Sequence, residues 1–400
     1  MKTLLQPFHL SRTAKKSIQK HLPRLKTEHI HPYRIPVSCP DISEKEERYV
    51  RLAMESKWIS GKGPYVEKFE QLFASQVSHT KYAIAVNSGT SALHLSLLAC
   101  NIGPGDEVII PTFTMIATAN AVRYTGATPV CVDADLATWN MDVTKIEARI
   151  TKRTKAIAPV HIYGLPVDMH PIQKLAKKYG LWVIEDAAEA HGAEYRGHRV
   201  GGLGDVAAFS FFANKIITTG EGGMITTNNK KIAHVVRTLR GHAFTRDYHF
   251  WHQYVGYSYE MTNLAAGVGL GQTERFRTFV AKRKKHAMLY TKLLHGIPGI
   301  TTPPQLRGYV SANWMYGVLV DSTKYGVNRN DLRMILAKKG IETRPFFVPI
   351  HMQPPYQLAS VGSYPVSEKL CCDGLYLPSG STLTDDEITY VATIIRKTQK

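Results

Sequence analysis

The central part of the chain alternates short apolar runs with segments that have helical spacing of hydrophobic positions. The runs are continuous rather than alternating, which is typical of strands covered by helices on both faces of a sheet. Repeated strand-helix units of this kind predict a mainly parallel α/β sheet. The apolar runs that define it are AIAV (83–86), EVIIP (107–111), TPVCVD (128–133), KAIAPVHIYG (155–164), LWVIED (181–186), VAAFSFF (206–212) and GGMITT (222–227).

Two further helices are predicted before this sheet, at 43–56 and 66–77, with a glycine-punctuated loop, WISGKGPY, at 58–65. A short helix is also expected around 142–150, after the apolar run TPVCVD. These elements belong to the same large unit as the sheet.

The pattern changes near residue 275, where the regular strand-helix alternation stops. FVAKRKKHAMLYTKLL (279–294) predicts a long helix. It is followed by a strand at 314–321, a helix at 328–340, a strand at 341–345 and a last helix at 385–397. This order is typical of a smaller α+β domain.

A chain of 400 residues exceeds the usual size of one hydrophobic core, so two packed domains are expected. We predict a basic N-terminal arm at 1–34, a large domain at 35–275 and a small C-terminal domain at 276–400. The arm contains no acidic residue before Glu28 and lacks the apolar core of a secretory signal.

Composition excludes several classes of protein. Apolar residues make up 44% and charged residues 20%, as in ordinary globular proteins. No run of about 18 apolar residues is present, so we expect no membrane segment. The five cysteines include no CxxC pair, which argues against a disulfide framework and a zinc site. We therefore expect no metal and a reducing, cytoplasmic setting.

The net charge of +18 raises the possibility of an acidic partner. The basic residues are spread along the chain, with only short groups such as KRKK at 282–285, and no nucleic-acid-binding signature accompanies them. We expect no nucleic-acid partner. A basic surface also suits attraction of a doubly charged nucleotide substrate.

Lys215 and Asp186 carry the clearest chemical signal. Lys215 lies in a loop rich in Ser, Gly and Thr, FSFFANKIITTGEGG, and Asp186 ends an apolar strand in WVIEDAAEAHGAEY. A lysine amine can form a Schiff base with the aldehyde of pyridoxal 5'-phosphate (PLP). A carboxylate can keep the pyridine nitrogen protonated, so that the ring withdraws electrons. Either residue alone is more often a surface lysine or a cap.

A phosphate site is predicted at the turn NSGTSALHL (87–95), where a strand meets a helix. Gly89, Thr90 and Ser91 lie at the bend, and backbone N–H groups at a helix N-terminus favour anions. Ser and Thr also cap helices that bind nothing, so the turn gains weight only beside Asp186 and Lys215. Ser210, five residues before the lysine, is a second candidate phosphate ligand.

Five motifs together resemble the sugar aminotransferases of nucleotide-sugar metabolism, the DegT/DnrJ/EryC/StrS-like family, which share the aspartate aminotransferase fold (PLP fold type I). The resemblance runs from about residue 35 to the end, and within the family it is nearest to the GDP-perosamine synthases. The motifs are NSGTSALHL, EVIIPTFT, EDAAEAHGAEY, FSFFANKIITTGEGG and IETRPFF.

The resemblance implies roles for individual residues. Lys215 would carry PLP, Asp186 would pair with the pyridine nitrogen, and the phosphate would lie at Gly89, Thr90 and Ser210. Met115 stands where relatives often place an aromatic residue on the cofactor face; its thioether can still cover a ring. Phe113 is nearby in another register. Glu189 occupies a further cofactor position, where many relatives have Gln.

Other positions would contact the sugar nucleotide: Ser60 and Gly61 in WISGKG, and Arg344 and His351 in TRPFFVPIH. An arginine suits the paired oxygens of a pyrophosphate, although Arg344 can also be only a salt-bridge partner. His161 and Tyr316 are expected to be satisfied in the core.

The segment GYSYEMTN (256–263) departs from the family, where GYNYRMT commonly reaches the neighbouring subunit's cofactor phosphate. Ser258 and Glu260 replace Asn and Arg. Ser258 could still donate a hydrogen bond, but a glutamate beside a phosphate is unfavourable. The segment is therefore not counted as a binding element.

The resemblance implies a homodimer that transfers an amino group from L-glutamate to the C4 ketone of GDP-4-keto-6-deoxymannose, giving GDP-perosamine for a polysaccharide such as an O-antigen. Three alternatives stay open. One is an aminotransferase for another keto nucleotide sugar, UDP- or dTDP-linked. A 3-dehydratase on this fold would carry His in place of Lys215. A non-enzymatic, basic nucleic-acid-binding protein on a PLP fold rests on net charge alone.

Overall fold

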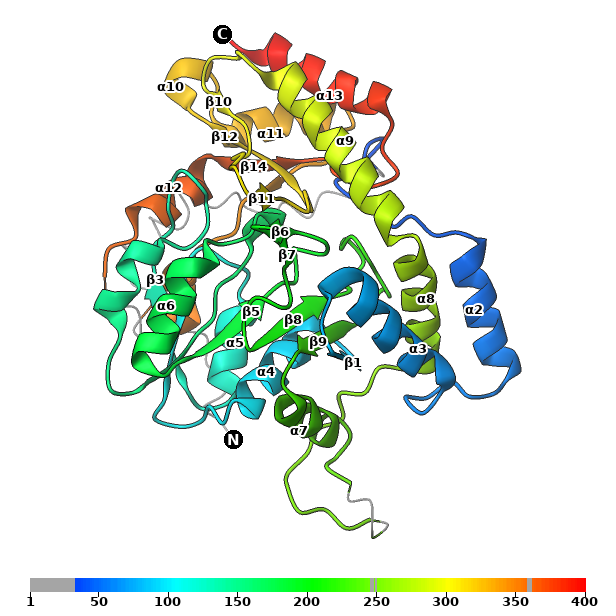
Figure 1. Cartoon of the computed structure of the whole chain (residues 1–400). Coiled ribbons are helices and arrows are strands. Elements are labelled where there is room, and N and C mark those ends of the chain that lie inside the picture. The colour runs from blue at the N-terminus through cyan, green and yellow to red at the C-terminus, as the bar shows by residue number, and fades with distance from the viewer. Residues whose placement is uncertain (1–32, 245–247, 249, 358–361) are drawn as a thin grey trace, which may run out of the picture.

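The computed structural model describes residues 33–244, 248, 250–357 and 362–400. Its centre is a seven-stranded sheet of order β1-β9-β8-β5-β4-β2-β3 (Figure 1). β9 runs antiparallel to β1 and β8, and the other neighbours pair in parallel. The predicted mainly parallel sheet is thus confirmed. The strands are β1 (Tyr82–Val86), β2 (Glu107–Pro111), β3 (Thr128–Val132), β4 (Thr154–Ile157), β5 (Trp182–Asp186), β8 (Val206–Ser210) and β9 (Gly223–Thr227).

Helices cover both faces of this sheet, as the apolar strands require. Ile84 packs in one core cluster with residues of α4 (Gly89–Ala99), α5 (Ala117–Tyr124) and α7 (Lys230–Arg240). Its neighbour Ala85 points to the other face, among residues of α3 (Pro64–Phe73) and α8 (Asn263–Glu274). α6 (Met169–Tyr179) packs beside Val183 of β5.

The C-terminal part forms a second, antiparallel sheet of order β10-β12-β14-β13. Its strands are β10 (Ile300–Thr301), β12 (Tyr316–Val320), β14 (Gly374–Leu377) and β13 (Arg344–Pro345). Around it lie α9 (Phe276–Leu294), α10 (Ser322–Tyr325), α11 (Arg329–Lys338), α12 (Pro365–Asp373) and α13 (Asp385–Thr398). A third, small sheet combines β6 (Glu194–Tyr195) and β7 (His198–Arg199) with β11 (Tyr309–Val310).

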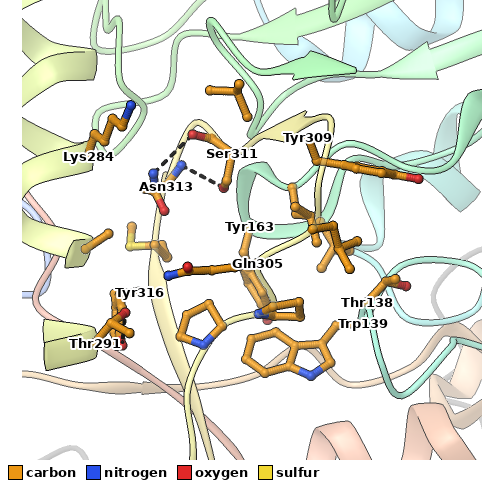
Figure 2. A pocket seen from close by; sticks show the side chains of 18 of the residues that line it. Thr138, Trp139, Tyr163, Lys284, Thr291, Gln305, Tyr309, Ser311, Asn313 and Tyr316 are labelled. Carbon is orange, nitrogen blue, oxygen red and sulfur yellow. Dashed lines mark hydrogen bonds between the residues drawn. The ribbon is translucent and has the colours of Figure 1, made fainter. Parts of the chain in front are cut away.

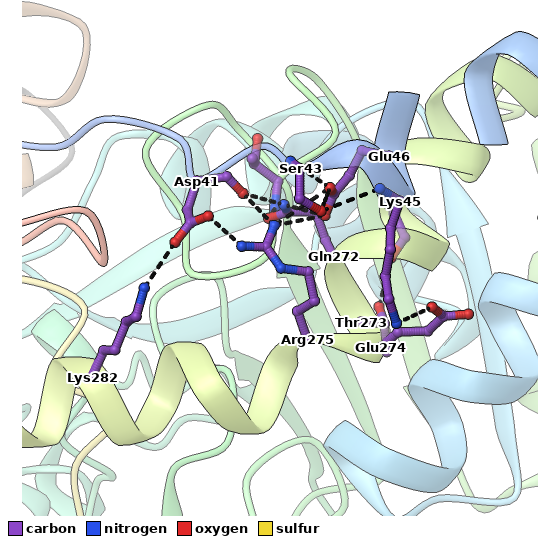
Figure 3. A network of polar contacts seen from close by, with 11 residues as sticks. Asp41, Ser43, Lys45, Glu46, Gln272, Thr273, Glu274, Arg275 and Lys282 are labelled. Atoms are coloured by element: carbon purple, nitrogen blue, oxygen red, sulfur yellow. Dashed lines mark hydrogen bonds and ion pairs between the residues drawn. The ribbon is translucent and has the colours of Figure 1, made fainter. Parts of the chain in front are cut away.

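A polar network joins the two parts of the chain where α8 ends and α9 begins (Figure 3). Arg275, between these helices, donates to the Asp41 carbonyl (3.0 Å) and to Glu46 of α2 (Glu44–Glu55; 3.2 Å). It also pairs with the Asp41 carboxylate, which Lys282 of α9 contacts at 3.3 Å. α9 begins one residue after the predicted domain boundary at 275. The division of the chain into two domains at this point stays a prediction.

The segment before α2 packs beside the second sheet, where Ile35 shares a core cluster with Val318 of β12 and Leu375 of β14. Ile35 forms a bridge with Ile341, and the Ser379 N–H donates to the Val37 carbonyl at 2.9 Å. Most of the predicted arm at 1–34 lies outside the described residues.

Local departures from the expected elements are small. Residues 142–150 form two 3-10 turns, Val143–Lys145 and Glu147–Arg149, instead of one helix. Nine residues with β-branched positions are too few to sustain an α-helix without tertiary support. The helix expected at 66–77 ends in a π-type turn, Ala74–Ser78. In the part of the chain that the structure describes, no helix is long and apolar enough to cross a bilayer.

Candidate active site

Asp186 lies at the carboxyl end of β5, buried to 5% exposure. Thr118 Oγ1 donates to Asp186 Oδ2 at 2.7 Å, and the Ala188 N–H donates to Oδ1 at 3.2 Å. Burial raises the pKa of this carboxyl, while Thr118 and Lys215 favour its charged form. A cationic N–H placed against it would offset the cost of burying the charge. The position therefore suits a protonated pyridine nitrogen.

Lys215 lies in the loop between β8 and β9, with a side chain that is 11% exposed. Its Nζ is 3.8 Å from Glu189 Oε1 and 3.7 Å from the centre of the Trp314 ring. Burial lowers the pKa of the Lys215 amine, and the carboxylates of Glu189 and Asp186 oppose that effect. A buried amine with a lowered pKa is suited to nucleophilic attack on an aldehyde and to proton transfer.

Glu189 brings a second buried carboxylate to the same lysine. The Tyr163 N–H donates to Glu189 Oε2 at 2.7 Å, which leaves Oε1 directed toward Lys215. Burial raises the pKa of Glu189 to about 7. Lys215, Asp186 and Glu189 therefore form one electrostatic cluster, and their contacts with PLP stay a prediction.

The start of α4 lies against the end of β8. A Cβ added at Gly89 would come within 2.7 Å of the Ser210 Cβ, so glycine is what allows this close approach. The approach places the first turn of α4 beside the Ser210 hydroxyl, and Thr90 follows on the same turn. Such a turn, with free N–H groups and hydroxyls, fits a phosphate group.

Ser91 has a structural task in this turn. Its hydroxyl donates to Asn87 Oδ1 (2.6 Å) and accepts from the Ser88 N–H (3.1 Å), while the Ser91 N–H donates to the Ser88 hydroxyl (3.1 Å). This is a capping box with serine at both positions. A cofactor contact by Ser91 stays a prediction.

Gly89→Ala is expected to weaken PLP binding by about tenfold, because the new methyl group would push the start of α4 away from Ser210. Equilibrium titration of cofactor-free protein with PLP, followed by absorbance, measures the effect. Gly103→Ala is the matched control, since a Cβ there meets nothing closer than the Thr125 carbonyl at 4.0 Å. A Gly89 variant that binds PLP as tightly as the control would contradict the assignment.

Met115 is half exposed in the turn between β2 and α5, and its sulfur accepts from the Ala117 N–H at 3.2 Å. Phe113 is buried and packs on Tyr163, Phe346 and Phe347. Phe113 therefore belongs to the core, and its register relative to the cofactor stays a prediction. Coverage of the cofactor by Met115 stays a prediction.

The loop with Ser60 and Gly61 packs on the segment that departs from the family pattern. The Asn263 N–H donates to the Ser60 carbonyl at 3.1 Å, and a Cβ at Gly61 would lie 3.0 Å from the Glu260 Cβ. Glu260 itself pairs with Lys62 at 3.1 Å. Lys62 of this loop thus neutralises the charge of Glu260 within the chain. Contact of Ser60 and Gly61 with the substrate stays a prediction.

Arg344 lies on β13 with an exposed side chain and donates from Nη2 and Nε to Glu342 Oε1, at 3.0 and 3.2 Å. His351 is held from both ring nitrogens, by Thr112 Oγ1 (2.7 Å, Nδ1) and Glu368 Oε1 (3.2 Å, Nε2). Burial lowers the pKa of His351. Thr112 directly follows β2, so His351 lies at the carboxyl edge of the sheet, whereas Arg344 is engaged in an ion pair.

His161 and Tyr316 are satisfied in the core, as expected. The Val167 N–H donates to His161 Nδ1 at 3.1 Å, so its Nε2 carries the proton and donates to Glu185 (3.1 Å). The Tyr316 hydroxyl bonds Thr291 at 2.9 Å.

The sequence analysis missed three residues that contact the cluster, namely Thr118, Tyr163 and Trp314. None stands in a motif with a recognised chemical pattern, and Trp314 lies in a stretch that predicts only a strand.

A cleft of about 370 Å³ lies between α9, the 303–316 segment and the 138–165 region (Figure 2). Tyr163 lines this cleft, and Lys215 does not. Among the described residues, no group of three or more potential ligands could hold a metal ion.

Proteins with similar sequences and structures agree with an aminotransferase site at this cluster. Residues 40–396 match the model of the DegT/DnrJ/EryC1/StrS aminotransferase family. The chain is 44% identical to the GDP-perosamine synthase of Escherichia coli O157:H7, over 91% of this chain and 98% of that protein. For the GDP-perosamine synthase of Caulobacter vibrioides the identity is 46%, over 90% and 96%. The crystal structure of DesI in the presence of its TDP-sugar product superposes with a TM-score of 0.85 at 30% identity, over 92% of each chain.

Proposed function

The chain belongs to the DegT/DnrJ/EryC1/StrS aminotransferase family, and from that premise we propose that it transfers an amino group from L-glutamate to the C4 ketone of a GDP-linked 4-keto-6-deoxy sugar, giving GDP-perosamine from GDP-4-keto-6-deoxymannose. The expected fold, activity and cofactor are confirmed: the protein is a PLP-dependent aminotransferase. The observation that carries the chemistry is the buried cluster of Lys215, Asp186 and Glu189. The choice of sugar rests on the similarity to GDP-perosamine synthases.

The residues of the site would have different roles in holding the cofactor and in moving protons. Bound PLP supplies an electron sink that makes the proton on the amine-bearing carbon acidic. Asp186 would hold the pyridine nitrogen, and Gly89, Thr90 and Ser210 would hold the phosphate. Lys215 would attach the cofactor and, once released, take a proton from the amino donor and return one to the acceptor carbon. Its lowered pKa leaves a fraction of uncharged amine available as the base.

The test of the substrate is a product analysis. Purified protein with PLP and L-glutamate is incubated with GDP-, UDP- and dTDP-linked 4-keto-6-deoxy sugars, and products are identified by mass spectrometry and NMR. We expect turnover of the GDP sugar to exceed that of the others by at least about tenfold, the value of one well-placed contact. Faster amination of a UDP- or dTDP-linked sugar would overturn the choice of nucleotide and leave the aminotransferase assignment intact.

Arg344→Ala is expected to weaken nucleotide-sugar binding by about ten- to a hundredfold and to spare the glutamate half-reaction. The reason is that a guanidinium pairs with a pyrophosphate, which glutamate lacks. Glu342→Gln is the informative companion, because it removes the carboxylate that now holds Arg344 at 3.0 Å. We expect that variant to bind the sugar nucleotide at least as well as the wild type.

Single-turnover absorbance traces separate the two half-reactions. Equal damage to both by Arg344→Ala would show that the arginine acts on the amino donor or on the fold. The main role of Arg344 would then be its ion pair with Glu342.

We also propose a homodimer in the cytoplasm. The described part of the segment between α7 and α8 exposes several large apolar side chains, among them Phe250 (73%), Trp251 (61%) and Tyr254 (65%). Exposure of several large apolar side chains in one segment suits a surface that a partner covers. All five cysteines are free thiols, which suits a reducing compartment. Sedimentation that shows an active monomer would contradict the dimer.

A further inference from the structure

Trp314 makes two contacts with adjacent residues of the lysine loop. Its ring centre lies 3.7 Å from Lys215 Nζ, well within the range of a cation–π contact. Its indole Nε1–H donates to the carbonyl of Asn214, one residue before the lysine, at 2.8 Å. One side chain therefore contacts both the amine of Lys215 and the backbone that carries it.

The tryptophan is itself held firmly. Arg283 of α9, buried in the core, donates from Nη1 to the Trp314 carbonyl at 2.6 Å and to the Ser379 carbonyl at 2.8 Å. The Tyr163 ring stacks on the indole with centroids 6.2 Å apart and an interplanar angle of 20°. Trp314 is 2% exposed, so neither contact has a solvent alternative.

The charged and titratable groups around the amine are few. Glu189 and Asp186 favour its protonated form, and Trp314 presents an aromatic face, which also attracts a cation. His191 lies in the same core, and burial lowers its pKa to about 3, so it stays uncharged at neutral pH. Burial disfavours the charged form of the Lys215 amine, and Glu189, Asp186 and the Trp314 ring each oppose that effect.

We propose that Trp314 is a positioning residue that receives the amine of Lys215 whenever the lysine is not bonded to the cofactor. After the amine has taken a proton from the amino donor, the ring face stabilises the ammonium group and keeps it directed until the proton is passed on. The inference rests on the proposed role of Lys215. It assigns the tryptophan no contact with substrate. The N–H bond to Asn214 fixes the loop, and the ring face fixes the amine.

The test measures the proton on Lys215 without turnover. Full-length protein freed of PLP by dialysis with hydroxylamine is labelled with trace acetic anhydride across a pH series, and mass spectrometry follows the Lys215 peptide. In Trp314→Leu the midpoint of labelling should move to lower pH, with about fivefold more uncharged amine at pH 7. Trp314→Phe, which keeps a ring face but lacks the N–H, should fall between wild type and the leucine variant.

The control is Trp139→Leu, which removes another buried indole, one that packs on Phe346. If Trp139→Leu only loosens the core, acetylation of Lys215 should increase at every pH. The midpoint of the labelling curve should then stay at the wild-type pH. A wild-type midpoint in Trp314→Leu, or an equal shift in Trp139→Leu, would overturn the proposal. Borohydride labelling of the PLP-loaded wild type at a lysine other than Lys215 would instead overturn the assignment of the lysine.

Discussion

Lys215→Ala abolishes transamination while the protein stays folded: we expect the rate to fall by at least about 10³-fold. Alanine removes both the amine that attaches PLP and the base that moves the proton. The absorption band of lysine-bound PLP should disappear, and far-UV circular dichroism should not change. The side chain is buried against Trp314 and Glu189, so a cavity and an unpaired carboxylate will lower the melting temperature somewhat.

Lys178→Ala is the matched control for this variant. Lys178 also pairs with a glutamate, Glu147 at 2.6 Å, but on an exposed part of α6. It should keep wild-type turnover. Retained turnover in Lys215→Ala, beyond what trace wild-type enzyme explains, would refute the assignment of the lysine.

Asp186→Asn is expected to keep PLP bound and to slow turnover by about 10²- to 10³-fold. The amide oxygen can keep the bond from the Ala188 N–H, and the amide NH2 can donate to the Thr118 hydroxyl, which is also able to accept, so the fold should survive. It cannot stabilise a protonated pyridine nitrogen, and without that charge the ring is a weaker electron sink. The measurement is kcat in steady state, with absorbance of bound PLP as a check of occupancy.

Asp205→Asn controls for loss of a carboxylate in the same sheet. Asp205 accepts from the Val183 N–H at 2.8 Å, just before β8 begins, at the opposite end of the strands from Asp186. Its variant should turn over normally if it folds. If Asp186→Asn were as active as the wild type, another group would have to protonate the ring nitrogen.

The sequence could predict the sheet and the central cluster for the same physical reason. Strands buried on both faces must be continuously apolar, so the polar residue that ends one, such as Asp186, lies at the sheet edge. The lysine loop follows a strand of the same sheet and reaches the same edge. The chemistry of Lys215 and Asp186 is then readable from two local motifs.

Contacts between residues that lie far apart along the chain could not be predicted from local motifs. Trp314 is about a hundred residues from Lys215 along the chain, and its contact depends on how β12 and α9 pack against the large sheet. Arg344 has the charge expected of a nucleotide ligand, but its partner in the structure is Glu342, two residues away. The local pattern could not decide between these tasks, because both require the same side chain.

A buried carboxylate is the centre of the polar contacts that attach α12 to the large sheet, and the Ala134 N–H adds a bond to the Ser367 hydroxyl at 3.1 Å. Asp133, just after β3, accepts from the Ser367 N–H (2.9 Å), the Ser367 hydroxyl (2.6 Å) and the Val366 N–H (3.3 Å) at the start of that helix. Moving α12 away would remove these three donors from Asp133, which would keep the Ala134 N–H at 2.8 Å and Lys145 Nζ at 3.6 Å, at a cost of roughly 1–3 kcal/mol. The contact between α12 and the large sheet should therefore resist separation.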